Sequence, residues 1–290
     1  MSDLRLGYVG LGNIGGPMAG RLAKWSGGLA VFDLAPDAVA KVVDQGARAV
    51  DSLAELAADS DIVGICVVND EQVRTVVAGE GGLLDSAKPG TIITVHSTIS
   101  PDTATDLAAT CAGKGVVLLD APISGGAPGA EQGRLAIMVG GDRESYLKLK
   151  EPFSLAAEMI VHAGEEVGAG TKMKLARNLL HFISFTATTE AARLAEAAGI
   201  DIAKLGKVVR HTDAITGGAG AIMLRDSTAP IADDDFWYGV FTHVRALGEK
   251  DLSLALELGD KLDVELPLGA IALRDLAAGL GVPHKEGDPS

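Results

Sequence analysis

The sequence predicts an α/β fold, with a doubly wound, mostly parallel sheet in the first part of the chain and an all-helical second part. Short apolar runs alternate with amphipathic stretches up to about residue 163. Strands that alternate with helices in this way favour parallel pairing, right-handed crossovers and helices on both faces of the sheet. A glycine-punctuated segment at residues 163–170 ends the pattern, and long helical periodicity follows it. We therefore expect two domains, at residues 1–164 and 165–290, joined by a long interdomain helix.

The expected strands are short apolar runs with helical stretches between them. Most of them are continuous enough to be buried on both faces, and the last ones are expected at the far edge of the sheet. The buried strands are expected at residues 4–9, 29–32, 62–68, 91–95 and 116–119, and the edge strands at 135–139 and 159–161.

Long helices are expected after the sheet. Alanines recur among larger apolar residues from 171 to 198, and Gly199 supplies a stop for this helix. Two further helices are expected at about residues 239–261 and 266–278, the second with Pro267 in its first turn, where proline is tolerated. Long helices with small-residue faces often pack against a second subunit, so we expect a homodimer or a homotetramer.

The acidic charge balance argues against polyanionic partners. The chain has 25 basic and 39 acidic residues, a formal net charge of −14, and its basic residues are not gathered in a patch. Because nucleic acids and anionic membranes are bound by clustered Lys and Arg, we expect neither as a partner. No apolar stretch approaches the ~18 residues of a membrane span, and no basic, apolar leader opens the chain, so we expect a cytoplasmic protein. We expect no metal site.

A glycine-rich loop follows the first expected strand and precedes a helical stretch. In the pattern G-x-G-x-x-G, the first glycine permits a tight turn, the second lets a pyrophosphate approach, and the third lets the helix pack closely on the strand. The helix start then offers free N–H groups to the phosphates. Such a pattern also arises by chance, but its place between strand and helix favours dinucleotide binding. The expected cofactor-binding residues of the loop are Gly10, Leu11, Gly12, Asn13, Ile14 and Gly15.

Asp33, at the end of the second expected strand, indicates which dinucleotide is bound. It follows the last glycine by 33 − 15 = 18 residues, close to the ~20 at which an acidic side chain meets the adenosine ribose hydroxyls. A carboxylate there would repel a 2′-phosphate, and no Arg follows in residues 34–36, so we expect NAD rather than NADP. The alternative is an Asp that only starts a turn before Pro36.

Ser124, Gly125 and Gly126 follow a strand at the carboxyl edge of the expected sheet, where open parallel sheets bind ligands. A hydroxyl together with bare backbone N–H groups can hold a carboxylate, and the absence of side chains lets the ligand come close. We expect these residues to bind a small carboxylate substrate. The alternative is an ordinary glycine turn.

Lys174 and Asn178 lie four residues apart in the expected long helix, so they share a face and can point into one pocket. An amine beside a carboxamide suits proton transfer next to substrate binding. Lys172, two residues earlier, is rotated by ~200° and faces the other way. The alternative for Lys174 is an ordinary solvated lysine.

Four motifs, taken in order, resemble those of β-hydroxyacid dehydrogenases, the family that includes 3-hydroxyisobutyrate dehydrogenase and tartronate semialdehyde reductase. They are GLGNIGGPMA at residues 10–19, DAPISGG at 120–126, GAGTKMKLARN at 168–178 and KDLSLAL at 250–256. The resemblance implies a Rossmann-type first domain and NAD-dependent interconversion of a small β-hydroxy acid and its semialdehyde. It implies that Lys174 is the catalytic residue, that Ser124, Gly125, Gly126 and Asn178 bind the substrate, and that Val67, Val68, Asn69, Thr98, Lys250 and Asp251 contact the cofactor.

Two features fall outside these motifs. His96 stands before Ser97 and Thr98, where relatives often carry Asp, and we interpret it as a structural hydrogen-bonding residue rather than a proton carrier. The segment 233–238 combines acidic with aromatic residues. Its acids are expected to face solvent, while Trp237 or Phe241 is expected to close over the substrate.

Three alternative functions stay open. A 6-phosphogluconate dehydrogenase would share the loop and the lysine but needs several basic groups for a phosphate, and the C-terminal segment supplies few. An imine reductase would resemble this chain less at the lysine position. A non-catalytic dinucleotide-binding protein would have no need to keep Lys174, Asn178 and the Ser-Gly-Gly turn together.

Overall fold

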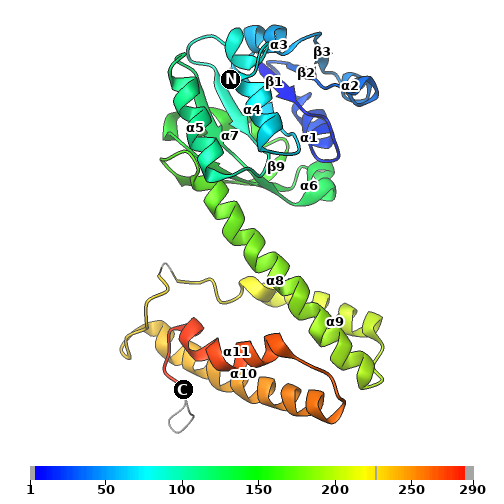
Figure 1. Ribbon diagram of the computed structural model, residues 1–290, viewed down its shortest axis with the longest axis vertical. Coiled ribbons are helices and arrows are strands. Elements are labelled where there is room, and N and C mark those ends of the chain that lie inside the picture. The colour runs from blue at the N-terminus through cyan, green and yellow to red at the C-terminus, as the bar shows by residue number, and fades with distance from the viewer. Residues whose placement is uncertain (1–3, 226, 285–290) are drawn as a thin grey trace. The chain divides into compact units, whose positions relative to one another are not determined.

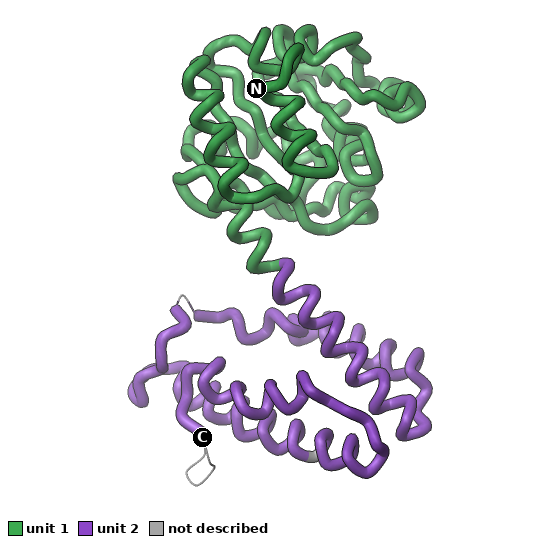
Figure 2. Tube along the Cα trace, viewed as in Figure 1, with its two compact units in different colours: residues 1–177 green, residues 178–290 purple. Residues whose placement is uncertain are grey.

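The computed structural model describes residues 4–225 and 227–284 and divides into two compact units, residues 1–177 and 178–290 (Figure 2). The border between the units falls inside the long helix α8 (Ala169–Ala197). The sheet of the first unit ends with its last strand at Gly164, five residues before α8 begins at Ala169.

The first unit is built on a nine-stranded sheet (Figure 1). Its strands run in the order β3-β2-β1-β4-β5-β6-β8-β7, and β9, which stands outside this order, also pairs with β8. Pairing is parallel from β3 to β6 and between β8 and β9, whereas β8 is antiparallel to β6 and β7. The strands are β1 (Leu6–Val9), β2 (Leu29–Phe32), β3 (Arg48–Ala49), β4 (Ile62–Ile65), β5 (Ile92–Val95), β6 (Val117–Asp120), β7 (Ile123–Ser124), β8 (Leu135–Gly140) and β9 (Ala157–Gly164).

The mostly parallel sheet confirms the fold class that the sequence predicts. The expected strands all form, although several are shorter than their apolar runs and β9 is longer than expected. The strands β3 and β7 were not expected, because two residues are too few to show the alternation that marks a strand. The second of these matters for the site, since it contains Ser124.

Helices cover both faces of this sheet, as a doubly wound Rossmann-type fold requires. Along β1, for example, Tyr8 lies in one buried cluster and Val9 in the other, because successive side chains of a strand point to opposite faces. The helices α1 (Gly15–Leu22), α2 (Pro36–Val43), α6 (Gly126–Gln132) and α7 (Arg143–Phe153) contribute to the first cluster. The helices α3 (Leu53–Asp59), α4 (Asp70–Ala78) and α5 (Pro101–Ala112) contribute to the second.

The second unit is helical throughout its described residues, apart from loops. It contains the remainder of α8 and the helices α9 (Ile202–Thr216), α10 (Phe236–Lys261) and α11 (Pro267–Leu280). The sequence predicts α8, α10 and α11 to within a few residues. The helices expected from the sequence do not include α9, which buries none of its described side chains although apolar residues such as Ile202, Leu205 and Val209 recur in it at helical spacing.

Phe241, one of the two residues expected to close over the substrate, is a core residue of the second unit. It is buried with Ile231, Leu280 and Val282, and the Trp237 ring stacks on it with centroids 5.8 Å apart. Asp235 accepts the Trp237 N–H at 2.7 Å and caps α10. That Trp237 or Phe241 closes over the substrate stays a prediction.

Of the helices that the described residues form, none combines the length and the apolar character needed to cross a membrane.

Candidate functional site

The glycine loop joins β1 to α1, and its three glycines meet three different constraints. Gly10 has a φ of +89°, which favours glycine, and a side chain there would lie against the Cys66 carbonyl oxygen. A side chain at Gly15 would lie against the Gly10 carbonyl oxygen, so glycine lets α1 pack this closely. By contrast, nothing lies within 4 Å of the place that a Cβ of Gly12 would take. The loop is therefore tight where it must turn and open where a pyrophosphate would approach.

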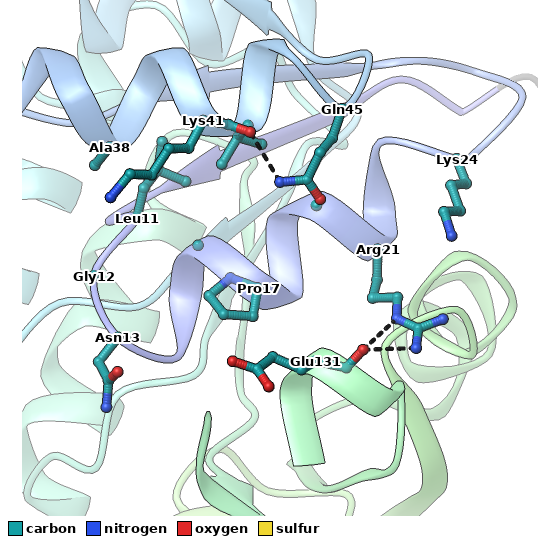
Figure 3. A pocket seen from close by; sticks show the side chains of 13 residues that line it. Leu11, Gly12, Asn13, Pro17, Arg21, Lys24, Ala38, Lys41, Gln45 and Glu131 are labelled. Carbon is teal, nitrogen blue, oxygen red and sulfur yellow. Dashed lines mark hydrogen bonds between the residues drawn. The ribbon is translucent and has the colours of Figure 1, made fainter. Parts of the chain in front are cut away.

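The start of α1 and the groove beside it suit an anionic ligand. Ile14 precedes the helix and no side chain caps it, so the first N–H groups are not used by a capping side chain. A groove of about 790 Å³ opens beside the loop, and Figure 3 shows Asn13 at one end of it and Lys41 from α2 on its wall. Arg21, on α1, also lines the groove and donates to the Glu131 carbonyl oxygen at 3.0 and 2.6 Å.

Asp33 holds the glycine loop in place and can still accept hydrogen bonds from a ligand. Its Oδ2 accepts the Leu11 N–H at 2.6 Å, and its Oδ1 accepts the Ala35 N–H at 2.8 Å. Asp33 therefore has the turn-forming role that the sequence analysis gave as the alternative, because it holds both the glycine loop and the residues after β2 by hydrogen bonds. Each carboxylate oxygen has a second lone pair, and the side chain is only partly buried. The glycine loop, the open space at Gly12 and this carboxylate together fit a dinucleotide whose ribose hydroxyls need an acceptor.

The ends of β4 and β5 lie at the same edge of the sheet as the glycine loop, because β1, β4 and β5 are parallel neighbours. Ser97, which the sequence analysis did not place in the site, links these ends. Its Oγ accepts the Val67 N–H at 2.9 Å and donates to the Val67 carbonyl at 2.7 Å. Val68 and Thr98 are exposed at this edge. The Asn69 side chain caps α4 by accepting the Gln72 N–H at 2.9 Å, which gives it a structural role.

Lys174 is a buried lysine with two protein partners. Only 8% of it is exposed, and its Nζ donates to the Ile123 carbonyl at 2.5 Å and to the Ser124 Oγ at 2.8 Å. Burial lowers the pKa of the Lys174 amine below its ordinary value, and the charge of Arg177 lowers it further. Lys172 is exposed. The structure therefore brings two of the expected site residues, Lys174 and Ser124, into direct contact.

The two glycines after Ser124 adopt backbone conformations that favour glycine. Gly125 has a φ of +129° and Gly126 a φ of +63°, and both are exposed. Gly126 begins α6, and no side chain caps this helix start. The turn therefore presents bare backbone beside the Ser124 hydroxyl.

Asn178, Lys250 and Asp251 belong to the second unit. Asn178 follows Lys174 by one turn of α8, the spacing at which two side chains share a helix face. Lys250 and Asp251 are exposed on α10 and pair with one another at 3.0 Å. Their expected contact with the cofactor stays a prediction.

His96 has the structural role that we expected. Its ring is buried, and because a carbonyl can only accept, its Nδ1–H donates to the Ala121 oxygen at 2.9 Å. The ring lies near Tyr8 and Phe153, with centroids 5.9 and 5.1 Å away. Burial lowers the pKa of His96 to about 4, so the ring is neutral near pH 7. Its Nε2 is buried and has no partner among the described residues.

Asp120 is a buried side chain to which the sequence analysis assigned no role. It is 0% exposed, and its two oxygens accept the Gly168 N–H at 2.7 Å and the Thr171 N–H at 2.6 Å. One sequence feature could have indicated a role for Asp120: it is an acidic residue at the end of an apolar strand, directly before the turn at Ser124. No group of three or more His, Cys, Asp or Glu that could hold a metal ion occurs among the residues that the structure describes.

Comparison with known families gives matches over nearly the whole chain. A model described as the NAD binding domain of 6-phosphogluconate dehydrogenase matches residues 5–164. A second model, described as the NAD-binding domain of NADP-dependent 3-hydroxyisobutyrate dehydrogenase, matches residues 168–288.

Individual proteins are similar to this chain over most of their length. An uncharacterized oxidoreductase of Mycobacterium tuberculosis is 54% identical over 99% of this chain and 96% of its own. The 3-hydroxyisobutyrate dehydrogenase of Pseudomonas aeruginosa is 36% identical over 94% of this chain and 90% of its own. A crystal structure from Mycobacterium avium, described provisionally as an oxidoreductase, is 53% identical, with a TM-score of 0.93 over 97% of this chain and 100% of that chain.

Proposed function

Since the chain belongs to the β-hydroxyacid dehydrogenase family of NAD-binding oxidoreductases, which act on CH–OH groups, we propose that it interconverts a small β-hydroxy acid and its semialdehyde. Lys174 is the general acid and base of this reaction. The substrate carries a carboxylate, as 3-hydroxyisobutyrate does.

The hydrogen bonding of Lys174 is the observation that carries the proposal. Two positions on its Nζ are taken, by the Ile123 carbonyl and the Ser124 Oγ. A neutral amine keeps one lone pair beyond these two N–H donors, and an ammonium keeps one N–H. The remaining position is therefore the one that takes the hydroxyl proton in oxidation and returns it in reduction. The lowered pKa of Lys174 makes the neutral form more accessible near working pH.

Ser124 connects proton transfer to substrate binding. Its Oγ accepts from Lys174, so its own hydroxyl hydrogen is left to donate to a substrate carboxylate. The exposed backbone at Gly125 and Gly126 supplies further donors, and Asn178 anchors the substrate from the next turn of α8.

NAD is held by the loop at residues 10–15 and by Asp33, together with the exposed ends of β4 and β5. When bound, the nicotinamide supplies the hydride acceptor for oxidation and, in reduced form, the hydride donor for reduction. Asp33 favours NAD over NADP, because a 2′-phosphate placed at this carboxylate would meet like charge.

A panel of hydroxy acids, assayed with NAD and NADP by the absorbance of the reduced cofactor, tests the proposal. Its members are 3-hydroxyisobutyrate, L-serine and 2-(hydroxymethyl)glutarate, for which relatives of this chain are named, together with 6-phosphogluconate and a cyclic imine. We expect turnover with NAD and a β-hydroxy acid. Lys174→Ala should lower kcat by about 10²- to 10⁴-fold and leave NADH binding intact.

Lys172→Ala is the matched control, because it removes an exposed lysine from the same helix turn. Equal activity of Lys174→Ala and wild type would remove the assignment. Turnover of 6-phosphogluconate or the imine alone would favour one of those enzyme classes. Cofactor binding without turnover of any member would favour a non-catalytic dinucleotide-binding protein.

Exposed apolar side chains in the second unit support a homodimer or homotetramer, which we propose as the working form. Leu179, Phe182 and Phe185 on α8 and Val208 and Ile215 on α9 are all exposed. The rings of Phe182 and Phe185 are neighbours, with centroids 5.9 Å apart. Large exposed apolar side chains of this kind are typical of surfaces that another chain covers.

A further inference from the structure

The first turn of α8, which carries the proposed catalytic lysine, is held by a carboxylate from a different part of the chain. Asp120 is the last residue of β6, and it accepts the N–H groups of Gly168 and Thr171, 48 and 51 residues later. The first N–H groups of a helix have no partner within the helix, and a carboxylate that accepts them also interacts favourably with the helix dipole. Asp120 is thus a long-range N-terminal cap of α8.

The same short segment of chain then holds Lys174. Beyond Asp120 the chain continues through β7, where Ile123 and Ser124 accept the hydrogen bonds of the lysine amine. Thr171 and Lys174 are three residues apart, so both face this segment. The start of α8 is therefore fixed at two levels, one turn apart, against one stretch of five residues from Asp120 to Ser124.

Two glycines bring the backbone of α8 directly onto the strands. Gly140, on β8, pairs with Asp120, and a Cβ at Gly140 would lie 2.8 Å from the Ala169 nitrogen and 2.7 Å from the Gly170 nitrogen. A Cβ at Gly170 would lie 2.7 Å from the Asp120 carbonyl oxygen. The junction is closely packed, so the loss of a hydrogen bond there cannot be compensated by a small shift of the helix towards the sheet.

We propose that Asp120 is a positioning residue of the reaction, whose carboxylate sets the height and rotation of the first turn of α8 so that the Lys174 amine meets Ser124. This inference rests on the proposed function for its catalytic consequence. Asp120 does not contact the reacting atoms. It acts through α8, and misplacement of an amine by about 1 Å can cost about 10²-fold in rate.

Asp120→Asn tests the proposal with an isosteric change. The amide offers one oxygen to two N–H donors and turns its own NH₂ toward the other, so one of the two caps is lost. We expect a fall in kcat of about 10-fold to 10²-fold with a smaller change in KM. A lysine that is less firmly buried against Ser124 should also titrate at higher pH, so the pH profile of oxidation should move to higher pH.

Asp142→Ala is the matched control. Asp142 caps α7 in the same unit by accepting the Ser145 N–H at 2.9 Å, and α7 carries no proposed site residue. The control should lower the melting temperature and leave kcat and the pH profile at wild-type values. Wild-type kcat and pH profile in Asp120→Asn would overturn the proposal, as would the same kinetic change in the control.

A second variant and a second readout cover the remaining outcomes. Gly140→Ala keeps the charge of Asp120 but places a methyl group against its Oδ1 and against the Gly170 and Ala169 nitrogens, so the carboxylate must shift from the start of α8. This variant should change the kinetics in the same direction if Asp120→Asn does not fold. NMR titration of labelled lysine side chains reads the Lys174 pKa without turnover. If the wild-type protein turned over no panel member, a raised Lys174 pKa in Asp120→Asn alone would support the positioning role while the proposed function failed. An unchanged pKa would reject both.

Discussion

The two units of this chain bury their apolar side chains to very different degrees. The first unit has two buried clusters, one on each face of its sheet, with helices over both. In the second unit the described buried cluster consists of Ile231, Phe241, Leu280 and Val282, while Phe182 and Phe185 on α8 remain 59% and 54% exposed. The first unit thus covers both faces of its sheet with its own helices, whereas the second unit leaves large apolar side chains of α8 exposed as an apolar surface. The proposed homo-oligomer would cover that surface.

The largest effect is expected from charges placed on that surface. Burial of one phenylalanine side chain contributes about 1.5–3 kcal/mol, so Phe182→Glu with Phe185→Glu should raise the dissociation constant of the assembly roughly 10²- to 10⁴-fold. Sedimentation equilibrium measures this change. Leu147→Glu is the control, because Leu147 is equally exposed on α7 of the first unit. An unchanged oligomer in the double variant would place the interface on another face.

A second prediction concerns the buried core of the first unit. The folded-state pKa of His96 is about 4, below its ordinary value of 6.5, so the folded protein binds a proton less readily than the unfolded chain. Stability should therefore be independent of His96 above pH 6.5 and fall as the pH drops from 6.5 to about 4, by roughly 3 kcal/mol. Chemical denaturation at several pH values measures the fall.

His96→Gln should remove this part of the pH dependence. The lowered pKa of Asp70 acts in the same direction in both proteins, so the difference between variant and wild type isolates His96. If the free energy of unfolding fell by the same amount in both proteins between pH 6.5 and 4, the buried His96 ring would not be the cause of the fall.

The third prediction, with a smaller expected effect, concerns two substitutions in the glycine loop. One should affect the stability of the fold and the other should affect cofactor binding. Gly10→Ala forces a side chain into a φ of +89° and against the Cys66 carbonyl, so it should lower the stability of the first unit by about 1–3 kcal/mol. Gly12→Ala meets open space and should leave stability unchanged while weakening NADH binding, because it fills the approach of the pyrophosphate. Thermal unfolding and NADH fluorescence titration distinguish the two. Equal stability of both variants would contradict the assigned roles.

The same contrast between units explains how much the sequence could predict. Strands buried on both faces are read from continuous apolar runs, so the sheet of the first unit was predicted nearly strand by strand. Helix α9 was missed although Ile202, Leu205 and Val209 recur at helical spacing, because Gly206 and the polar residues 210–213 interrupt the apolar pattern.

The site was predictable where spacing decides geometry. Lys174 could be chosen over Lys172 because rotation along a helix separates them, and the structure buries the first and exposes the second. The role of Asp120 could not be predicted, because its partners Gly168 and Thr171 are brought to it by the tertiary fold. No local spacing encodes a contact across 48 residues.

The smallest effect is expected at the end of the first unit, where Arg177 lies three residues after Lys174. The charge of Arg177 lowers the pKa of Lys174, so Arg177→Gln should raise it. Oxidation requires the neutral amine and reduction the ammonium, so the pH profiles of both directions should move to higher pH. Arg177 is exposed, so salt should screen its charge and bring wild type and variant closer together. Initial rates across pH at low and high salt measure this, with Lys172→Gln as the control. A profile that moved to lower pH would show that Arg177 acts on the lysine through something other than its charge.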